Sequence, residues 1–353
     1  MTQTNTITLI RPDDWHLHVR DGSIMQTVIQ HTAAQFKRAI IMPNLNPPVT
    51  SVAQAKTYYQ SIKSSLDKND GLDVDFEPLM VLYLTENMSA KTIRDAARSP
   101  LIQAIKYYPA GATTNSDSGV SNFEKMYPLF EVMQEVNLPL LVHGEVTDPA
   151  VDIFDREKIF IDKHLAPLVD HFPALRIVLE HVTTAEGVQF VDDSTTKIAA
   201  TVTAHHLLIN RNELFVGGIK PHHYCLPILK RAQHQQALIN AVTAENNTRF
   251  FLGTDSAPHL QYAKESSCGC AGIYTAHAAI ELYTEVFDKA EALDKLEQFT
   301  SFNGPNFYQL PRNTETISLE RKPLAIVDSY AIQDDTLIPF RAGTTLSWHL
   351  TGQ

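Results

Sequence analysis

Cysteine is scarce in this chain, which has three cysteines among its 353 residues. Three thiols cannot all pair within one chain and are too few for a disulfide framework, so a small secreted fold held by disulfides is excluded. Long apolar runs are missing as well, because no stretch reaches the roughly 18 residues that a membrane helix needs. The start of the sequence shows no basic segment followed by a long apolar one, as a secretory signal would. We therefore expect a cytoplasmic protein that does not bind membranes.

Basic residues are also fewer than acidic ones. The 29 lysines and arginines are outnumbered by 40 aspartates and glutamates, which gives a formal net charge of -11. Binding to phosphate backbones requires a basic surface, and no long run of Lys or Arg provides one, so we expect no nucleic-acid partner. A small anionic substrate is compatible with this composition if cations gather locally in a pocket.

Strand-like segments alternate with helix-length segments along most of the chain. No linker, short repeat or low-complexity segment interrupts them, and we expect one domain over residues 1–353. The alternation predicts an α/β fold, a (β/α)8 barrel with a short C-terminal extension beyond Leu310 that packs on the barrel. The expected strands lie near residues 6–9, 38–42, 77–84, 101–106, 138–143, 176–181, 197–203 and 249–254, and helices are expected at 52–66, 123–136, 226–244 and 271–287.

Residues that can ligate a metal stand where five of these apolar runs stop. A single histidine after a strand carries little information, but five such coincidences indicate one site built from many strand ends. In a (β/α)8 barrel the chemistry takes place at the C-terminal ends of the parallel strands, where all these positions meet. The residues are His16, His18, Lys106, His143, His181 and Asp255.

The residue types at the C-terminal end of the predicted barrel favour zinc. His16 and His18 are two residues apart, so in an extended segment both imidazoles project to one face and can bind one ion. With His143 and His181 they supply four imidazoles, a donor set that suits zinc. Asp255 adds a carboxylate that can ligate metal and accept a proton from metal-bound water.

Lys106 admits two interpretations. A charged ammonium beside four histidines and a dication would be repelled, whereas the neutral amine, favoured by burial and nearby cations, can add CO2 and form a carbamate. The carbamate has two oxygens and a negative charge, so it can bridge two metal ions. The alternative is a strand-end lysine that pairs with a carboxylate elsewhere in the chain.

Other conspicuous residues are interpreted as structural. His205 and His206 are expected at the end of a strand, where neighbours point to opposite faces, so at most one would face the pocket. Cys225, Cys268 and Cys270 could bind a further soft metal, but free thiols that are buried or at the pocket rim are the preferred interpretation. The loop at residues 110–119, rich in small and hydroxyl side chains, is either an ordinary βα loop or a lid over the site.

Seven segments in this order resemble the dihydroorotase family, in particular its short bacterial homodimeric type within the amidohydrolase superfamily. The resemblance extends from Asp14 to Tyr308, and the segments are DDWHLHVRDG, MPNLNPP, IKYYPAGATTNS, LLVHGE, LEHVTT, PHHYCLPILK and GTDSAPH. It implies the reversible cyclisation of N-carbamoyl-L-aspartate to (S)-dihydroorotate plus water, a step of de novo pyrimidine (UMP) biosynthesis, catalysed by a homodimer.

The resemblance also implies roles for the metal-ligating residues. One zinc would be bound by His16, His18 and Asp255, and the other by His143 and His181. A carbamylated Lys106 (N6-carboxylysine) and a hydroxide would bridge these two Zn2+ ions of each subunit. The hydroxide would act as the nucleophile, with Asp255 as general acid and base.

The substrate-binding residues are likewise implied by the resemblance. Arg20, Asn44 and His259 would bind the substrate carboxylate, and a guanidinium is well shaped for that role. His143 would contact the substrate as well as the metal. Thr113 and Thr114 would form the tip of a mobile lid. The backbone contacts to the pyrimidine ring would come from Leu226, Ala271 and Gly272.

Two rival functions follow from the same residues. A related cyclic amidohydrolase could open a hydantoin or allantoin ring, but those rings need not carry the carboxylate that Arg20, Asn44 and His259 suit. A non-catalytic paralogue, kept as a scaffold, would be expected to have lost metal ligands, and this chain retains all of them. We therefore expect an enzyme with a carboxylate-bearing substrate.

Overall fold

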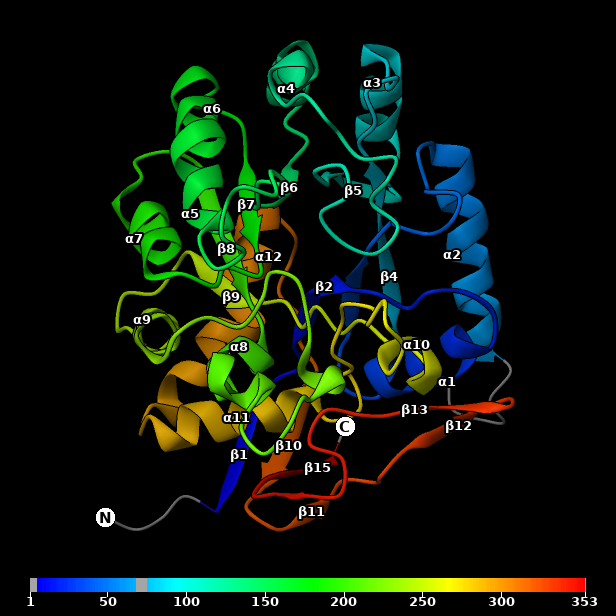
Figure 1. Ribbon diagram of the computed structural model, residues 1–353, viewed down its shortest axis with the longest axis vertical. Helices are drawn as coiled ribbons and strands as arrows, with labels where there is room; N and C mark the ends of the chain where they lie inside the picture. The colour runs from blue at the N-terminus through cyan, green and yellow to red at the C-terminus, as the bar shows by residue number, and fades with distance from the viewer. Residues whose placement is uncertain (1–4, 68–74, 353) are drawn as a thin grey trace.

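Eight parallel strands form a barrel in the computed structural model, which describes residues 5–67 and 75–352. The strands follow one another in sequence order around the sheet, and helices cover its outer side (Figure 1). The last strand meets the first through backbone hydrogen bonds, because Asp255 N donates to His16 O at 2.8 Å and His18 N donates to Ser256 O at 3.1 Å. The predicted (β/α)8 barrel is therefore confirmed. Its strands are β2 (Asp13–Leu17), β3 (Arg38–Ile41), β4 (Glu77–Tyr83), β5 (Ile102–Tyr107), β6 (Leu140–His143), β7 (Ile177–Glu180), β8 (Ile198–Val202) and β9 (Phe250–Leu252).

The helices place their apolar faces on the barrel, and some of them begin at a polar cap. Ser89 accepts a hydrogen bond from Thr92 N at the start of α3, and Thr184 accepts one from Gly187 N at the start of α7. The helices are α1 (Gly22–Ala33), α2 (Val52–Asp67), α3 (Ala90–Arg98), α4 (Tyr127–Glu135), α5 (Arg156–Phe160), α6 (Ala166–His171), α7 (Ala185–Asp193), α8 (Ala204–Leu208), α9 (Ala232–Val242), α10 (Gln261–Lys264), α11 (Ala279–Lys289) and α12 (Asn303–Tyr308). Short 3-10 or π segments are η1 (Glu124–Met126), η2 (Ile161–Leu165), η3 (Arg211–Leu214), η4 (Pro221–His223), η5 (Leu293–Lys295) and η6 (Gln298–Phe302).

Helix α12 closes the N-terminal end of the barrel. The ring of Tyr308 stacks on Trp15 with centroids 4.5 Å apart, and a Cβ at Gly304 would collide with the Trp15 indole. Apolar side chains from the strands fill the interior above this plug. The C-terminal end is left to polar side chains, and the site forms there.

One predicted barrel strand is wrong. Residues 6–9 do form a strand, β1 (Thr6–Ile10), but it lies outside the barrel and pairs antiparallel with β10 (Thr316–Glu320). The first barrel strand is β2, all of whose residues are buried, whereas β1 is largely open to solvent. β2 was missed because three of its five residues, Asp13, Asp14 and His16, are polar, and so it lacks an apolar run.

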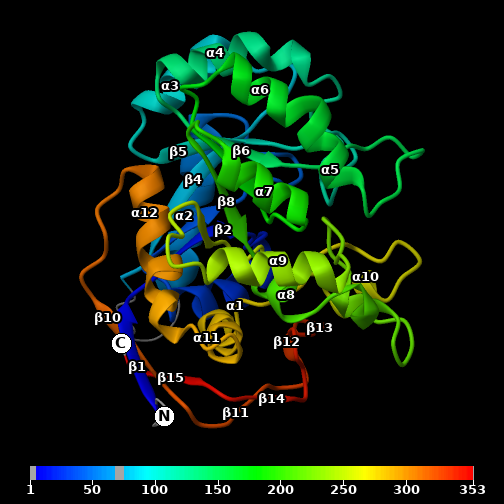
Figure 2. The same ribbon diagram turned by 90° about the vertical axis from the view of Figure 1, so that its left-hand side faces the viewer.

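The C-terminal extension consists of short strands packed against one side of the barrel (Figure 2). β10 joins β1 to β15 (His349–Gly352), so that segments near both ends of the described chain share one small sheet. The remaining strands are β11 (Leu324–Ala325), β12 (Tyr330–Ile332), β13 (Asp335–Leu337) and β14 (Thr345–Leu346). Within residues 5–67 and 75–352, no helix is both long and apolar enough to cross a membrane.

The predicted helices require three corrections. The helix expected at 271–287 begins only at Ala279, because the segment before it is irregular: Ile273 bridges to the loop after β9, where Ala257 N donates to Ile273 O at 2.9 Å, and residues 276–278 form a turn. The helix expected at 226–244 begins at Ala232. His205 and His206 lie in helix α8 rather than in a strand, and both are buried.

Candidate metal centre

Three predicted ligands converge where β2 meets the loop after β9. The Nε2 atoms of His16 and His18 lie 3.2 and 3.1 Å from Asp255 Oδ1 and 3.3 Å from each other. All three residues are buried. Burial lowers the pKa of His16, but the carboxylates of Glu180 and Asp255 outweigh it and raise that pKa to about 9. The charge of the His16 imidazole therefore balances the carboxylates beside it. The ligand atoms of His16, His18 and Asp255 lie close enough together to bind one metal ion.

His143 and His181 complete the group of imidazoles. The ring of His181 lies 4.8 Å from that of His143 and 5.1 Å from that of His16, measured between centroids. His181 Nδ1 is buried and has no hydrogen-bond partner among the described residues. The structure thus brings together all the ligands predicted from strand ends, from β2, β5, β6 and the loops after β7 and β9.

The two ligands that follow strands are held in a strained backbone conformation. His181 and Asp255 have φ angles of 42° and 44°, in the left-handed region that a non-glycine residue seldom adopts. The surrounding hydrogen bonds impose it, because Thr201 Oγ1 accepts from His181 N at 2.7 Å and His16 O accepts from Asp255 N at 2.8 Å. Strain of this kind at two strand ends is typical of a functional site.

Lys106 is fully buried at the end of β5 and bonds to the carboxylate of Glu180. Burial lowers its pKa, and the neighbouring Glu180 opposes that effect. The lysine–carboxylate pair, one of the two interpretations of this residue, is the arrangement seen in the structure. The carbamate remains a prediction.

Glu180 is a site residue that the sequence analysis missed. It is fully buried, with Oε1 3.1 Å from His16 Nδ1 and Oε2 bonded to Lys106. This contact turns His16 so that Nε2 faces Asp255, as a carboxylate behind a metal-bound histidine does. The signal was available, because Val178 faces the barrel interior and Glu180 has the same parity in β7.

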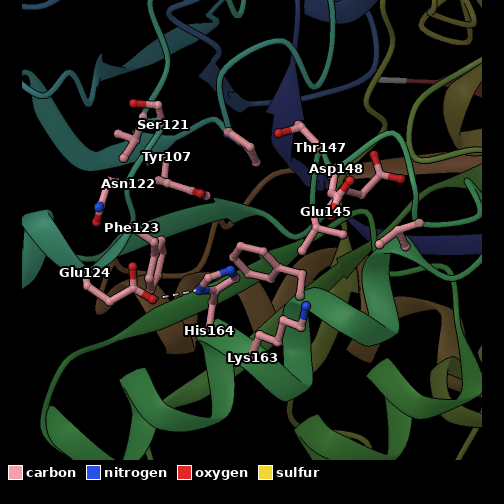
Figure 3. A pocket seen from close by; sticks show the side chains of 15 residues that line it. Tyr107, Ser121, Asn122, Phe123, Glu124, Glu145, Thr147, Asp148, Lys163 and His164 are labelled. Carbon is pink, nitrogen blue, oxygen red and sulfur yellow. Dashed lines mark hydrogen bonds and ion pairs between the residues drawn. The ribbon is translucent and has the colours of Figure 1, made fainter.

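Glu145 is a second missed residue. Its Oε2 lies 2.8 Å from His143 Nε2. Since a carboxylate accepts, Nε2 carries the proton, and in the neutral imidazole Nδ1 is the nitrogen with a lone pair. Its Oε1 is buried without a partner among the described residues. Glu145 also lines a polar cavity of about 280 Å³ beside the centre, opposite Lys163 and His164 (Figure 3). Glu145 therefore orients His143 from outside the ring of ligands.

Asp14 joins the two barrel strands that carry the first ligand group. Its carboxylate accepts from His16 N at 3.1 Å, from Thr254 N at 2.9 Å and from Thr254 Oγ1 at 2.6 Å. Burial raises the pKa of Asp14 to about 7, although these hydrogen bonds oppose it. Asp14 thereby fixes the spacing between β2 and the loop that carries Asp255.

The residues expected to bind a carboxylate lie together at the mouth. Arg20 Nη2 is 2.9 Å from His259 Nε2, and Asn44 Oδ1 is 2.9 Å from His18 Nδ1. Burial and the Arg20 charge lower the pKa of His259 to about 2, so its imidazole is neutral and accepts from the guanidinium. The structure therefore places a cation and an amide beside the first ligand group.

The loop after β5 reaches across this mouth. Asn44 Nδ2 donates to Thr114 O at 3.0 Å, and Asn115 Nδ2 donates to Asn44 O at 2.9 Å. Thr114 Oγ1 also lies 3.5 Å from Ala271 O, while Thr113 N donates to Ser116 Oγ at 2.9 Å. The loop thus contacts two of the predicted substrate-binding residues, Asn44 and Ala271, as a lid over the mouth would.

The three residues predicted to contact the ring lie on two irregular segments. Gly272 N donates to Tyr224 O at 3.0 Å, which joins the segment of Leu226 to that of Ala271. Gly272 has a φ of 153°, and a Cβ there would lie 2.6 Å from Ala257 O. Only glycine fits at this position, because both the backbone angle and the space exclude a side chain.

Three of the residues set aside in the sequence analysis, His205, His206 and Cys225, lie together in a separate buried group. His206 uses both ring nitrogens, which lie 2.7 Å from Thr203 Oγ1 and 3.1 Å from Pro227 O. Cys225 Sγ is 3.9 Å from His206 Nε2, and burial raises the pKa of this thiol to about 12. Neither side chain therefore offers a free lone pair or a thiolate to a metal.

Comparison with known proteins identifies relatives over almost the whole chain. A family model described as the amidohydrolase family matches residues 6–339. The dihydroorotase of Nitrosococcus oceani is 57% identical over 345 residues, covering 98% of this chain and 99% of that protein. The crystal structure of dihydroorotase from Campylobacter jejuni is 34% identical with a TM-score of 0.89. That of Saccharomyces cerevisiae dihydroorotase in complex with 5-fluoroorotic acid is 32% identical with a TM-score of 0.88, and each structure covers 99% of both chains.

Proposed function

The chain belongs to the amidohydrolase family and, within it, to the dihydroorotases of pyrimidine biosynthesis, and from this we propose how its residues act. The reaction is the reversible cyclisation of N-carbamoyl-L-aspartate to (S)-dihydroorotate plus water. The observation that carries the proposal is the convergence of Nε2 of His16, Nε2 of His18 and Oδ1 of Asp255 within 3.3 Å of one another, beside the guanidinium of Arg20.

The donor set fits two zinc ions. His16, His18 and Asp255 would hold the first, and the unpartnered Nδ1 of His181 indicates a place for the second, with His143. When bound, zinc lowers the pKa of water to about 7 and polarises a carbonyl. Lys106, carboxylated on Nζ, would supply the bridge between the two ions.

Glu180 supports the proposed carbamate in two ways. Its Oε1 faces His16 Nδ1 at 3.1 Å, and its Oε2 faces Lys106 Nζ. The Nζ of a lysine carbamate retains one hydrogen, so it can still donate to Oε2 while its two oxygens turn toward the histidines. Glu180 would therefore orient both ligands in the loaded enzyme.

Asp255 moves the proton. In ring opening, water attacks the ring carbonyl carbon, the carboxylate of Asp255 takes one of its protons and delivers it to the ring nitrogen, and the C–N bond breaks to leave a carboxyl group and a ureido NH2 group. In ring closure the ureido nitrogen attacks the side-chain carboxyl carbon in its acid form. The proton of that nitrogen passes through Asp255 to the carboxyl OH, which leaves as water. A general acid–base contribution of this kind is typically worth about 10²–10⁴-fold.

Arg20, Asn44 and His259 would hold the carboxylate that remains outside the ring. Arg20 presents its guanidinium from the same segment as the first ligand group and lies against His259 at 2.9 Å. Hydantoin and allantoin lack that carboxylate, so the same site gives them no ionic contact.

The first test measures ring opening of L-dihydroorotate by zinc-loaded protein, with hydantoin and allantoin in parallel. We expect turnover of dihydroorotate alone. Arg20→Gln should raise KM about 10- to 100-fold, as loss of a charge-assisted hydrogen bond does, while Arg231→Gln, at an exposed arginine outside the site, should leave KM unchanged. Turnover of a rival ring with dihydroorotate untouched would show that the substrate is misassigned.

The organisation of the protein is also proposed. A single domain over residues 1–353 agrees with the pairing of β10, in the C-terminal extension, with β1. We propose in addition that the protein forms a homodimer in the cytoplasm. Light scattering of the purified protein at micromolar concentration measures the assembly directly. A mass of one subunit across the concentration range would contradict the dimer.

A further inference from the structure

Lys264 is buried at the end of α10 and directs its ammonium group at three backbone carbonyls. Its Nζ donates to Tyr224 O at 2.8 Å, to Cys270 O at 2.7 Å and to Gly272 O at 2.7 Å. An ammonium has three protons, so every donor of this side chain is used on the backbone. The ammonium also lies 5.8 Å from the centroid of the Tyr224 ring. A buried cation whose hydrogen bonds all go to carbonyls is uncommon and indicates that those carbonyls must be held in place.

The three carbonyls belong to two segments that are distant in sequence and irregular in structure. Residues 224–226 follow η4, and residues 270–272 follow the turn at Gly269. Besides Lys264, the backbone hydrogen bond from Gly272 N to Tyr224 O at 3.0 Å joins them. These segments carry Leu226, Ala271 and Gly272, the residues assigned to the substrate ring.

Peptide geometry connects Lys264 to that surface. The C=O of Cys270 and the N–H of Ala271 share one planar trans peptide, so they point in opposite directions. A carbonyl fixed on Lys264 Nζ therefore directs the Ala271 N–H away from the lysine. The carbonyls of Gly272 and Tyr224 are fixed on the same ammonium, so the backbone next to Ala271 and next to Leu226 is held as well.

We infer that Lys264 is a positioning residue for substrate: its ammonium fixes the two backbone segments that present hydrogen-bonding groups to the dihydroorotate ring. This inference rests on the proposed function. Lys264 itself contacts neither substrate nor metal, and it acts through the orientation of the peptides it binds.

The test replaces Lys264 by methionine, which has a similar length and no donor. Two quantities are measured on zinc-loaded protein: KM and kcat for L-dihydroorotate, and the Kd of orotate, an unreactive planar analogue. Zinc content and the thermal melting temperature are measured alongside. The matched control is Lys230→Met, because Lys230 is also buried but its Nζ donates to a single carbonyl, Ile228 O at 3.0 Å, outside both segments.

We expect Lys264→Met to raise KM and the orotate Kd about tenfold or more, as weakened hydrogen bonds to the ring would, with kcat within a few-fold of wild type and full zinc content. Lys230→Met should change neither constant. Lys264→Arg keeps the positive charge, so it should fold. The planar guanidinium cannot donate to all three carbonyls from a single nitrogen, so the Kd of orotate should lie between those of wild type and Lys264→Met. The arginine variant tests the positioning role if the methionine variant does not fold.

The outcomes separate the two proposals. If wild type turns over dihydroorotate and Lys264→Met or Lys264→Arg binds orotate as tightly as wild type, the positioning role is overturned and the proposed function stands. A fall in kcat and zinc content with unchanged KM would also overturn it, because the lysine would then support the metal centre. Absence of dihydroorotate turnover in wild type would instead overturn the proposed function.

Discussion

Replacement of Lys106 by alanine tests the metal centre most directly. In the structure Lys106 is fully buried and pairs with Glu180. When the lysine is removed, Glu180 retains one ion-pair partner among the described residues, His16 Nδ1 at 3.1 Å. Breaking a buried ion pair costs about 3–5 kcal/mol. Because His16 still compensates Glu180, we expect the lower end of that range, about 3 kcal/mol, for the unfolding of zinc-free protein.

The loss of function should be larger than the loss of stability. Without a carbamate, each zinc loses an anionic ligand, so zinc content should fall below two equivalents and kcat should fall by about 10³-fold or more, the effect of several kcal/mol of charge stabilisation. The assay measures zinc by atomic emission and turnover of L-dihydroorotate, with and without added acetate or propionate.

Three results together identify the carbamate. Small carboxylates should partly restore both zinc and turnover in Lys106→Ala by replacing the bridge, and zinc reconstitution of the wild-type protein should be slower in buffer depleted of CO2 than in bicarbonate. Lys230→Ala, at a buried lysine outside the centre, should keep its zinc. Two bound zinc ions and wild-type turnover in Lys106→Ala would refute the reasoning.

Three further predictions concern the base, the loop and a buried acid. Asp255→Asn should retain at least one zinc yet lose about 10²–10⁴-fold in kcat; a wild-type kcat would remove it as the base. Thr113→Ala combined with Thr114→Ala should lower kcat far more than zinc content, and unchanged turnover would exclude a lid. Burial raises the pKa of Glu281 from 4.5 to about 7, so the folded protein loses stability as the pH rises from 4.5 through 7, by about 3 kcal/mol at most. The side chain of Glu281→Gln can still accept a hydrogen bond from Leu350 N. In urea unfolding, the free energy of unfolding of this variant should therefore exceed that of wild type at pH 8 and equal it near pH 4.5. An equal increase in that free energy at both pH values would contradict the argument.

The barrel and its ligands could be predicted because both follow local rules. Apolar runs such as LPLLV before His143 form buried parallel strands, and the residue after such a run lies at the barrel mouth. The prediction failed for the first strand. TITLI alternates as a strand should, while DDWHL has polar residues at three of its five positions, so β1 was taken for the barrel strand β2.

The helix expected at 271–287 shows a different limit. Its C-terminal half forms α11, but the first eight residues are not helical, because Ile273 among them bridges to the loop after β9 at Ser256 and Ala257. Local propensity does not register such a pairing. This segment carries Ala271 and Gly272, which are assigned to the substrate ring. The pairing that keeps it out of the helix is therefore also what makes it available for that role.

The sequence by itself determined the alternation of strands and helices, the order of the metal ligands and the family to which they point, since these depend on periodicity and on the ends of strands. Tertiary structure alone decided which groups support those ligands. Glu180 meets His16 across 164 positions of the chain, and Lys264 gathers carbonyls from two segments. A buried charge is stable only where partners from elsewhere satisfy it, and those partners exist only once the barrel has closed.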